Sequence, residues 1–149
     1  MKKISLVFAL VLFAASASFA QILEPVKWQF AAKKVSNTEA VIFMKAVINP
    51  GWHIYSQSVE EGGPIKTSFT FEPSNDFTLV GKTAEPQPKR KMEEVFKMEV
   101  PYFDKEVTFQ QKVKLKKGQT TVKGIVEFMA CDATRCLPPE EVEFTVAVK

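Results

Sequence analysis

A two-residue alternation of apolar and polar side chains runs through most of the sequence after residue 20. It is clearest in three segments: VKWQF (26–30), EVTFQQKVKL (106–115) and EVEFTVAV (141–148). Successive side chains of a β-strand point to opposite faces, so this pattern predicts strands with one buried face. In 106–115 the residues expected to share that face are Val107, Phe109, Gln111, Val113 and Leu115. The sequence shows no long amphipathic helix pattern and therefore predicts an all-β fold.

Further strands are expected between turn signals. They cover residues 40–48, 67–72, 77–80 and 121–130. Clusters of Asn, Pro and Gly, such as Asn49-Pro50-Gly51 and Gly62-Gly63-Pro64, separate them. About seven or eight short strands in one chain predict an antiparallel β-sandwich of immunoglobulin-like type. We expect a single domain over residues 21–149.

One long segment, Gly81 to Met98, carries no clear strand pattern. It begins polar and Pro-rich, and we interpret it as an irregular loop, a kind of segment that is often functional. Its basic cluster Lys89-Arg90-Lys91 is expected to be solvated. The net charge of the sequence is only +3, so we expect no nucleic-acid partner.

The first twenty residues have the features of a secretory signal peptide. Lys2 and Lys3 precede an apolar run, and Ser18-Phe19-Ala20 places small residues before a cleavage point. The apolar run is shorter than the roughly 20 residues of a spanning helix. We therefore expect export to the periplasm, with residues 1–20 removed and no stable membrane insertion afterwards.

Cys131 and Cys136 are the only cysteines, with four residues between them. An oxidising compartment favours a disulfide between them. The four residues between them can form the tip of a hairpin, whose geometry allows the bond. A ring this short stabilises a fold by only about 2 kcal/mol in the chain-entropy model. The pair thus forms either a structural disulfide of small stabilising effect or a redox-active disulfide, and the spacing alone leaves both interpretations open.

The cysteine segment CDATRCLPPEEVEF (131–144) resembles the active-site hairpin of the N-terminal periplasmic domain of DsbD-type transmembrane disulfide reductases. Two other segments resemble the same domain in the same order. NPGWHIYS (49–56) is similar to its early aromatic strand, and EEVFKMEVPYF (93–103) is similar to the segment with its cap loop. The resemblance extends over nearly the whole chain after residue 20.

The resemblance implies an immunoglobulin-like sandwich whose cysteine pair relays electrons and needs no cofactor. It implies that Cys136 forms mixed disulfides with partners and that Cys131 is the resolving thiol. It places other residues beside the pair or in a cap over it: Tyr55, His53, Glu93, Glu94 and either Val95 or Phe96. The implied partners are thioredoxin-like exported oxidoreductases and, because the sequence ends at Lys149, a separate membrane reductase.

This chain departs from the family pattern in two places. The best-known members have five residues between the cysteines, and Lys97 stands where a glycine is common. Whether the chain acts as a component of a protein-disulfide reductase or only as an electron carrier stays open. Two alternatives also stay open: a binding or scaffolding β-sandwich with a structural disulfide, and a copper-binding envelope protein using Met92, Met98, Met129 and the cysteines.

Overall fold

The computed structural model describes residues 22–149, and the predicted signal peptide lies outside this range. All regular secondary structure in the described residues is β-strand, and every strand pair is antiparallel. Within residues 22–149 no helix is long and apolar enough to cross a membrane. The prediction of an all-β fold is confirmed.

The described residues form eleven strands. They are β1 (Val26–Lys34), β2 (Glu39–Ile48), β3 (His53–Tyr55), β4 (Ser68–Phe71), β5 (Phe77–Ala84), β6 (Lys89–Glu93), β7 (Met98–Phe103), β8 (Glu106–Leu115), β9 (Thr120–Phe128), β10 (Ala130–Cys131) and β11 (Glu140–Val148). The strands expected from alternation correspond to β1, β2, β4, β5, β8, β9 and β11, with β10 at the end of the predicted 121–130 segment.

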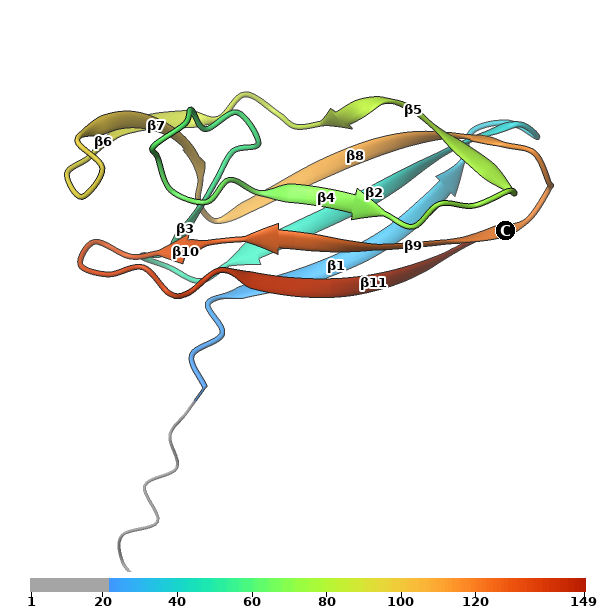
Figure 1. Ribbon diagram of the computed structural model, residues 1–149. Coiled ribbons are helices and arrows are strands. Elements are labelled where there is room, and N and C mark those ends of the chain that lie inside the picture. Colours follow the sequence, from blue (N-terminus) through green and yellow to red (C-terminus); the bar gives the residue numbers. More distant parts are fainter. Residues whose placement is uncertain (1–21) are drawn as a thin grey trace, which may run out of the picture.

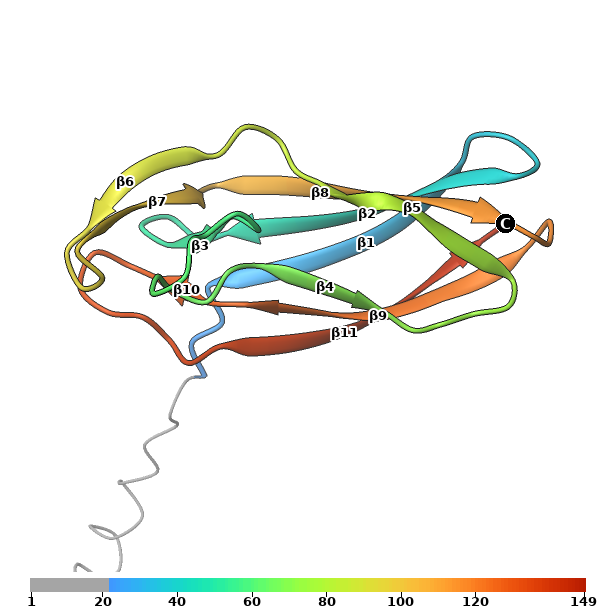
Figure 2. The same cartoon turned by 45° about the horizontal axis from the view of Figure 1, so that its top comes forward.

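Two sheets form the layers of a sandwich. One has the strand order β1-β2-β8-β5 and the other the order β11-β9-β4. Figures 1 and 2 show these strands running along one long axis, with the C-terminus at one end of it. Two aligned antiparallel sheets packed face to face make an immunoglobulin-like β-sandwich, as the sequence predicted.

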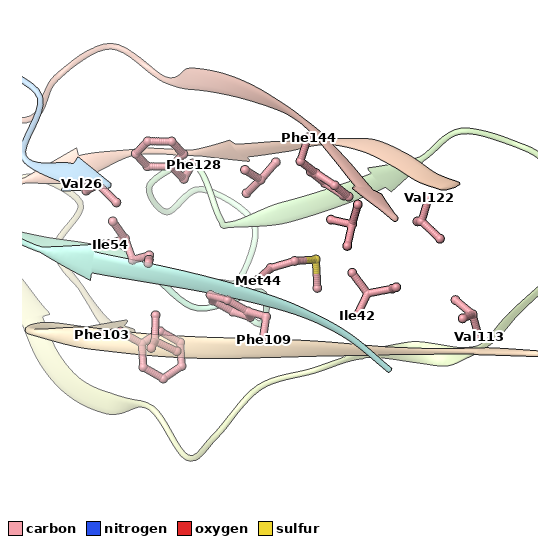
Figure 3. Close-up of a cluster of buried hydrophobic side chains, with 14 of the residues drawn as sticks. Val26, Ile42, Met44, Ile54, Phe103, Phe109, Val113, Val122, Phe128 and Phe144 are labelled. Carbon is pink, nitrogen blue, oxygen red and sulfur yellow. The ribbon is translucent and has the colours of Figure 1, made fainter. Parts of the chain in front are cut away.

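The apolar residues of the alternating strands fill the space between the two layers. In Figure 3, Met44 of β2 and Phe109 of β8 lie on one side of the core, and Phe128 and Phe144 lie on the other. Every second residue of β8 is buried, including the polar Gln111. Its amide nitrogen donates to backbone carbonyls and its oxygen accepts from Thr83, so its burial leaves no polar group unpaired.

Gly124 allows the β11-β9-β4 sheet to pack closely at its centre. A Cβ atom at this position would lie 2.5 Å from the carbonyl oxygen of Thr70 and 2.6 Å from Cζ of Phe144. One of these contacts is to backbone, which cannot move aside as a flexible side chain can. A glycine is therefore required here by space, while its φ is not in the left-handed region.

The third sheet corrects the prediction that residues 81–98 form an irregular loop. It has the order β10-β3-β7-β6, and β6 pairs with β7 around a four-residue turn, 94–97. Pairing with β7 allows the charged segment KRKME to form an edge strand without an apolar alternation of its own. Lys97 in the turn has a left-handed backbone, with φ of 52°.

We call this third sheet the end sheet. It brings the β6–β7 turn and the loop between the two cysteines, which are distant in sequence, to the same end of the sandwich. β3 and β7 continue from the ends of β2 and β8, and β10 follows β9 after Met129. Both views show the β6–β7 turn and the loop after β10 at the end of the molecule opposite the C-terminus. This end carries both cysteines and the segment expected to cap them.

Candidate redox site

Cys131 and Cys136 are joined by a disulfide at the tip of a hairpin. The two residues form an isolated antiparallel bridge, and their Cα atoms lie 4.0 Å apart. The amide of Asp132 donates to the carbonyl of Arg135, and the amide of Leu137 donates to the carbonyl of Ala130. The hairpin expected from the sequence is thus closed by backbone bonds on both sides of the disulfide.

The two sulfur-bearing residues differ in their exposure to solvent. Cys131 lies on β10 and is only 1% exposed, whereas Cys136 lies beyond the loop and is exposed. Pro138 and Pro139, also exposed, follow Cys136 and keep this side of the loop out of regular sheet pairing. A protein partner can therefore approach one end of the disulfide while the other end stays inside the domain.

Asp132 holds the loop between the cysteines. Its Oδ1 accepts hydrogen bonds from the amide and hydroxyl of Thr134 and from the amide of Arg135. The bond from the Thr134 amide is the main reason that the pKa of Asp132 lies below its usual value. Arg135 turns its side chain toward Asp132, with Nε 3.5 Å from Oδ2, and lies over the Trp52 ring. The charge of Arg135 is thus balanced within the loop.

The buried end of the disulfide faces aromatic and polar side chains of the end sheet. Cys131 pairs directly with His53 in the β10–β3 ladder. Directly opposed residues have Cβ atoms about 5 Å apart and point to the same face. Tyr55, two residues after His53, lies on that face and is fully buried in a cluster with Cys131 and Val100. Tyr55 is therefore an interior residue beside the disulfide and not a surface aromatic.

Four side chains beside Cys131 form one hydrogen-bonded group, which we call the polar cluster: His53, Tyr55, Lys91 and Glu93. Nε2 of His53 lies 2.8 Å from Nζ of Lys91, 3.2 Å from the Tyr55 hydroxyl and 3.3 Å from Oε1 of Glu93. The Tyr55 hydroxyl donates to the same Oε1 at 3.3 Å. Lys91 also forms an ion pair with this oxygen.

Burial and the neighbouring charges determine which members of the polar cluster are ionised. Burial, with the charge of Lys91, lowers the pKa of His53, so the neutral imidazole is favoured. Burial and then the charge of Glu93 raise the pKa of the Tyr55 hydroxyl, which stays protonated. Burial alone would raise the pKa of Glu93, but its interactions with Lys91, together with smaller ones with His53 and Tyr55, outweigh this and lower it.

The residues expected in the cap have different positions. Glu93 ends β6 and points into the polar cluster, with 13% of its side chain exposed. Glu94 is exposed, and Val95 is 79% exposed. Phe96 is the half-buried residue of the turn, and its amide donates to the carbonyl of Glu93.

Sequence reasoning missed Lys91 and Tyr102 as neighbours of the site. The sequence predicts that Lys91 belongs to a solvated basic cluster, yet this residue contacts both His53 and Glu93. The Tyr102 ring packs edge-on to His53, with centroids 5.6 Å apart, and faces the Lys91 ammonium. Alternation within residues 89–93 puts Lys91 and Glu93 on one face, and that was the only local signal available.

A cleft of about 630 Å³ opens beside the polar cluster. Its lining includes His53, Lys91 and Tyr102 from the end sheet and Ala133 from the cysteine loop. Solvent and small solutes can thus reach Lys91 next to the redox pair. Within residues 22–149 no group of three His, Cys, Asp or Glu side chains is arranged to hold a metal ion.

Comparison with known proteins gives similarities to one family and to several solved structures. The family described as "Thiol:disulfide interchange protein DsbD, N-terminal" matches residues 20–148. The comparison with curated proteins found no match.

Three solved structures have similar folds. The reduced DsbD N-terminal domain of Neisseria meningitidis has 16% identity and a TM-score of 0.53, over 81% of this chain and 85% of that one. The same organism's DsbD N-terminal domain in complex with the PilB N-terminal domain has 17% identity and a TM-score of 0.55, over 84% and 87%. The N-terminal periplasmic domain of ScsB from Proteus mirabilis has 19% identity and a TM-score of 0.56, over 85% and 49%.

These solved structures support the fold, and the family match extends over nearly all of the described residues. The hairpin that resembles the family's active site also carries a disulfide between Cys131 and Cys136. This chain therefore belongs to the family of N-terminal domains of DsbD thiol:disulfide interchange proteins.

Proposed function

We propose that this chain is an exported electron carrier that exchanges its Cys131–Cys136 disulfide with the cysteine pairs of other proteins. The observation that carries the proposal is the asymmetry of the disulfide: Cys136 is exposed at the hairpin tip and Cys131 is 1% exposed. Exchange needs one sulfur that a partner can attack and a second sulfur held next to it. A disulfide that only stabilised the hairpin would not require this difference.

The exchange proceeds through a mixed disulfide. The thiolate of a reduced partner attacks Sγ of Cys136, the bond to Cys131 breaks, and Cys131 leaves with the electron pair as a thiolate. The partner's second thiolate then attacks the sulfur of the partner's first cysteine in the mixed disulfide. This forms the partner's disulfide and releases Cys136 as a thiolate. Two electrons have passed to this chain, and the released thiolates take up protons from solvent. The reverse sequence passes the electrons to a client disulfide.

The partners that fit this chemistry are proteins with an accessible cysteine pair. We assign them to thioredoxin-like exported oxidoreductases as clients and a separate membrane reductase as donor, following the family. The solved complex between a DsbD N-terminal domain and a PilB N-terminal domain supports a protein as the partner. The small net charge of +3 and the exposed prolines beside Cys136 are compatible with docking through loop contacts.

We further propose that the 94–97 turn protects the reduced pair until a partner docks. Phe96 is the half-buried apolar residue of this turn, and Val95 is exposed. The Phe96→Ala variant should be oxidised faster by a small-molecule disulfide than the parent, with Val95→Ala as the matched control. Equal oxidation rates for Phe96→Ala and the parent would exclude a shielding role for this side chain.

Single-cysteine variants test which sulfur meets the partner. Cys131→Ala keeps the exposed thiol at position 136, and Cys136→Ala keeps the buried thiol at position 131. With an aromatic disulfide reagent, the first variant should form a mixed disulfide about tenfold faster or more, because access limits the second. Equal rates, or faster reaction at Cys131, would contradict the proposed roles of the two cysteines.

A further inference from the structure

Nε2 of His53 lies between two groups that make opposite demands on it. An ammonium group can only donate hydrogen bonds, so the 2.8 Å contact from Lys91 requires Nε2 to be an acceptor. A carboxylate can only accept, so the 3.3 Å contact with Glu93 is favourable only if Nε2 carries a proton. Lys91 holds the shorter contact and also pairs with Glu93. The position of Lys91 therefore favours an imidazole whose Nε2 carries no proton.

The groups that face His53 come from all four strands of the end sheet. They are Cys131 of β10, Tyr55 of β3, Lys91 and Glu93 of β6, Tyr102 of β7 and, just after β7, Asp104. Asp104 is itself paired with Lys89, at 2.7 Å. With Lys91 charged, Glu93 ionised and His53 neutral, the polar cluster carries no net charge beside the buried sulfur.

We infer that Lys91 is a positioning residue of the exchange reaction: it neutralises Glu93 and keeps His53 uncharged, so the leaving thiolate of Cys131 forms beside no net negative charge. This inference rests on the proposed function. When a partner attacks Cys136, the electron pair of the broken bond goes to a sulfur that is 1% exposed. A buried thiolate is disfavoured by desolvation and further by an unpaired carboxylate nearby.

Removal of the Lys91 charge has a defined consequence for the polar cluster. In Lys91→Met, His53 loses the ammonium and keeps the carboxylate, so it binds a proton more readily. While His53 is protonated, its charge replaces that of Lys91 and the cluster stays neutral. Once pH rises and His53 loses this proton, Glu93 is left unpaired and opposes the Cys131 thiolate. The variant should therefore become slower than the parent only as pH rises.

The first test is an NMR titration of His53 in tag-free protein. His53 is the only histidine of the chain, so its imidazole signal is unambiguous. The titration midpoint of Lys91→Met should lie about one unit or more above that of the parent. Arg90→Met is the matched control, because Arg90 is on the same strand and is also carboxylate-paired, but it and its partner Glu99 are outside the polar cluster. Equal midpoints in Lys91→Met and the parent would overturn the inference.

The second test is the rate at which dithiothreitol reduces the disulfide of the folded protein. The parent and Lys91→Met should react alike near pH 5.5, and the parent should be about fivefold faster or more near pH 8. Arg90→Met should follow the parent, and Lys91→Arg should recover most of the rate. The double variant Lys91→Met with Glu93→Gln should also recover it, because it removes the unpaired charge. A purely structural role for Lys91 predicts no such rescue.

The outcomes of the second test separate this inference from the proposed function. If dithiothreitol does not reduce the folded parent, the proposed exchange itself is wrong. If the parent is reduced readily and Lys91→Met follows Arg90→Met at every pH, only the role of Lys91 is wrong.

Discussion

The sandwich body and the end sheet use the same antiparallel pairing but bury different kinds of side chain. Between the layers of the body lie apolar residues such as Met44 and Phe109, both fully buried. In the end sheet, His53 and Tyr55 are buried with hydrogen bonds to each other and to Glu93. Apolar burial dominates folding free energy, whereas buried polar groups must be paired to be tolerated. The body therefore supplies stability, and the end sheet supplies chemistry.

The strongest test of this contrast removes a large side chain from the body. Phe109 is fully buried and its ring packs against those of Trp28, Phe69 and Phe103. Phe109→Ala should lower the free energy of unfolding by about 3–5 kcal/mol, measured by urea denaturation. Val95→Ala, at a side chain that is 79% exposed, should change it by no more than about 0.5 kcal/mol. A small loss at Phe109 would contradict the assignment of stability to the body.

Removal of the disulfide should cost less than removal of that single aromatic ring. The ring closed by Cys131 and Cys136 is short, so the double variant to alanine should lose about 2 kcal/mol. It should keep the far-ultraviolet circular dichroism spectrum and the cooperative unfolding of the parent. An unfolded double variant, or a loss as large as that of Phe109→Ala, would make the bond a structural staple.

The polar cluster predicts a pH dependence of stability that the body does not. Burial and then Lys91 lower the pKa of His53 in the folded state, while the unfolded chain protonates near its ordinary value of about 6.5. Below about pH 7 the unfolded chain thus binds more protons than the folded protein. As pH falls through this range, the free energy of unfolding decreases until pH reaches the lowered pKa of His53 in the folded state. Urea denaturation between about pH 5 and 7.5 measures this slope.

The variant His53→Phe isolates the contribution of the imidazole to that slope. It removes the titrating group and should flatten the pH dependence in this window. The lowered pKa of Glu93 acts at lower pH, where stability is lost as the carboxylate protonates. An unchanged slope in His53→Phe would show that His53 does not titrate differently in the folded and unfolded states.

The smallest expected effect is at the turn of the end sheet. Lys97 has a left-handed φ of 52°, which costs a residue with a Cβ roughly 1 kcal/mol. Lys97→Gly should raise the free energy of unfolding by up to about 1 kcal/mol. Lys123→Gly, in the interior of β9, should lower it by about 0.5–1 kcal/mol. Destabilisation by Lys97→Gly would show that this lysine makes a compensating interaction.

The body could be predicted from sequence because each of its strands carries its own signal. The alternation in residues 106–115 matches the buried face of β8, Gln111 included. The end sheet has no such signal. β3 has three residues and is buried throughout, so it shows no alternation, and β6 has the charged sequence KRKME. These strands form because β7 lies between them and pairs with both.

The site was predictable only where local sequence contains its chemistry. The cysteine pair and its hairpin follow from their spacing, and the family resemblance led to His53, Tyr55 and Glu93. The unequal exposure of Cys131 and Cys136 follows from the packing of the end sheet, which spacing does not express. Lys91 was missed for the same reason, because its partner His53 lies 38 positions earlier in the sequence.

The reduction potential of the Cys131–Cys136 pair tests the central claim most directly. It is measured by equilibrating the folded protein with glutathione buffers and quantifying the oxidised and reduced forms. Exchange proteins have potentials of roughly −120 to −270 mV, and structural disulfides typically lie below about −300 mV. Our account predicts a value in the first range. A value well below about −300 mV would contradict it. The domain would then be a binding module whose hairpin has a structural disulfide.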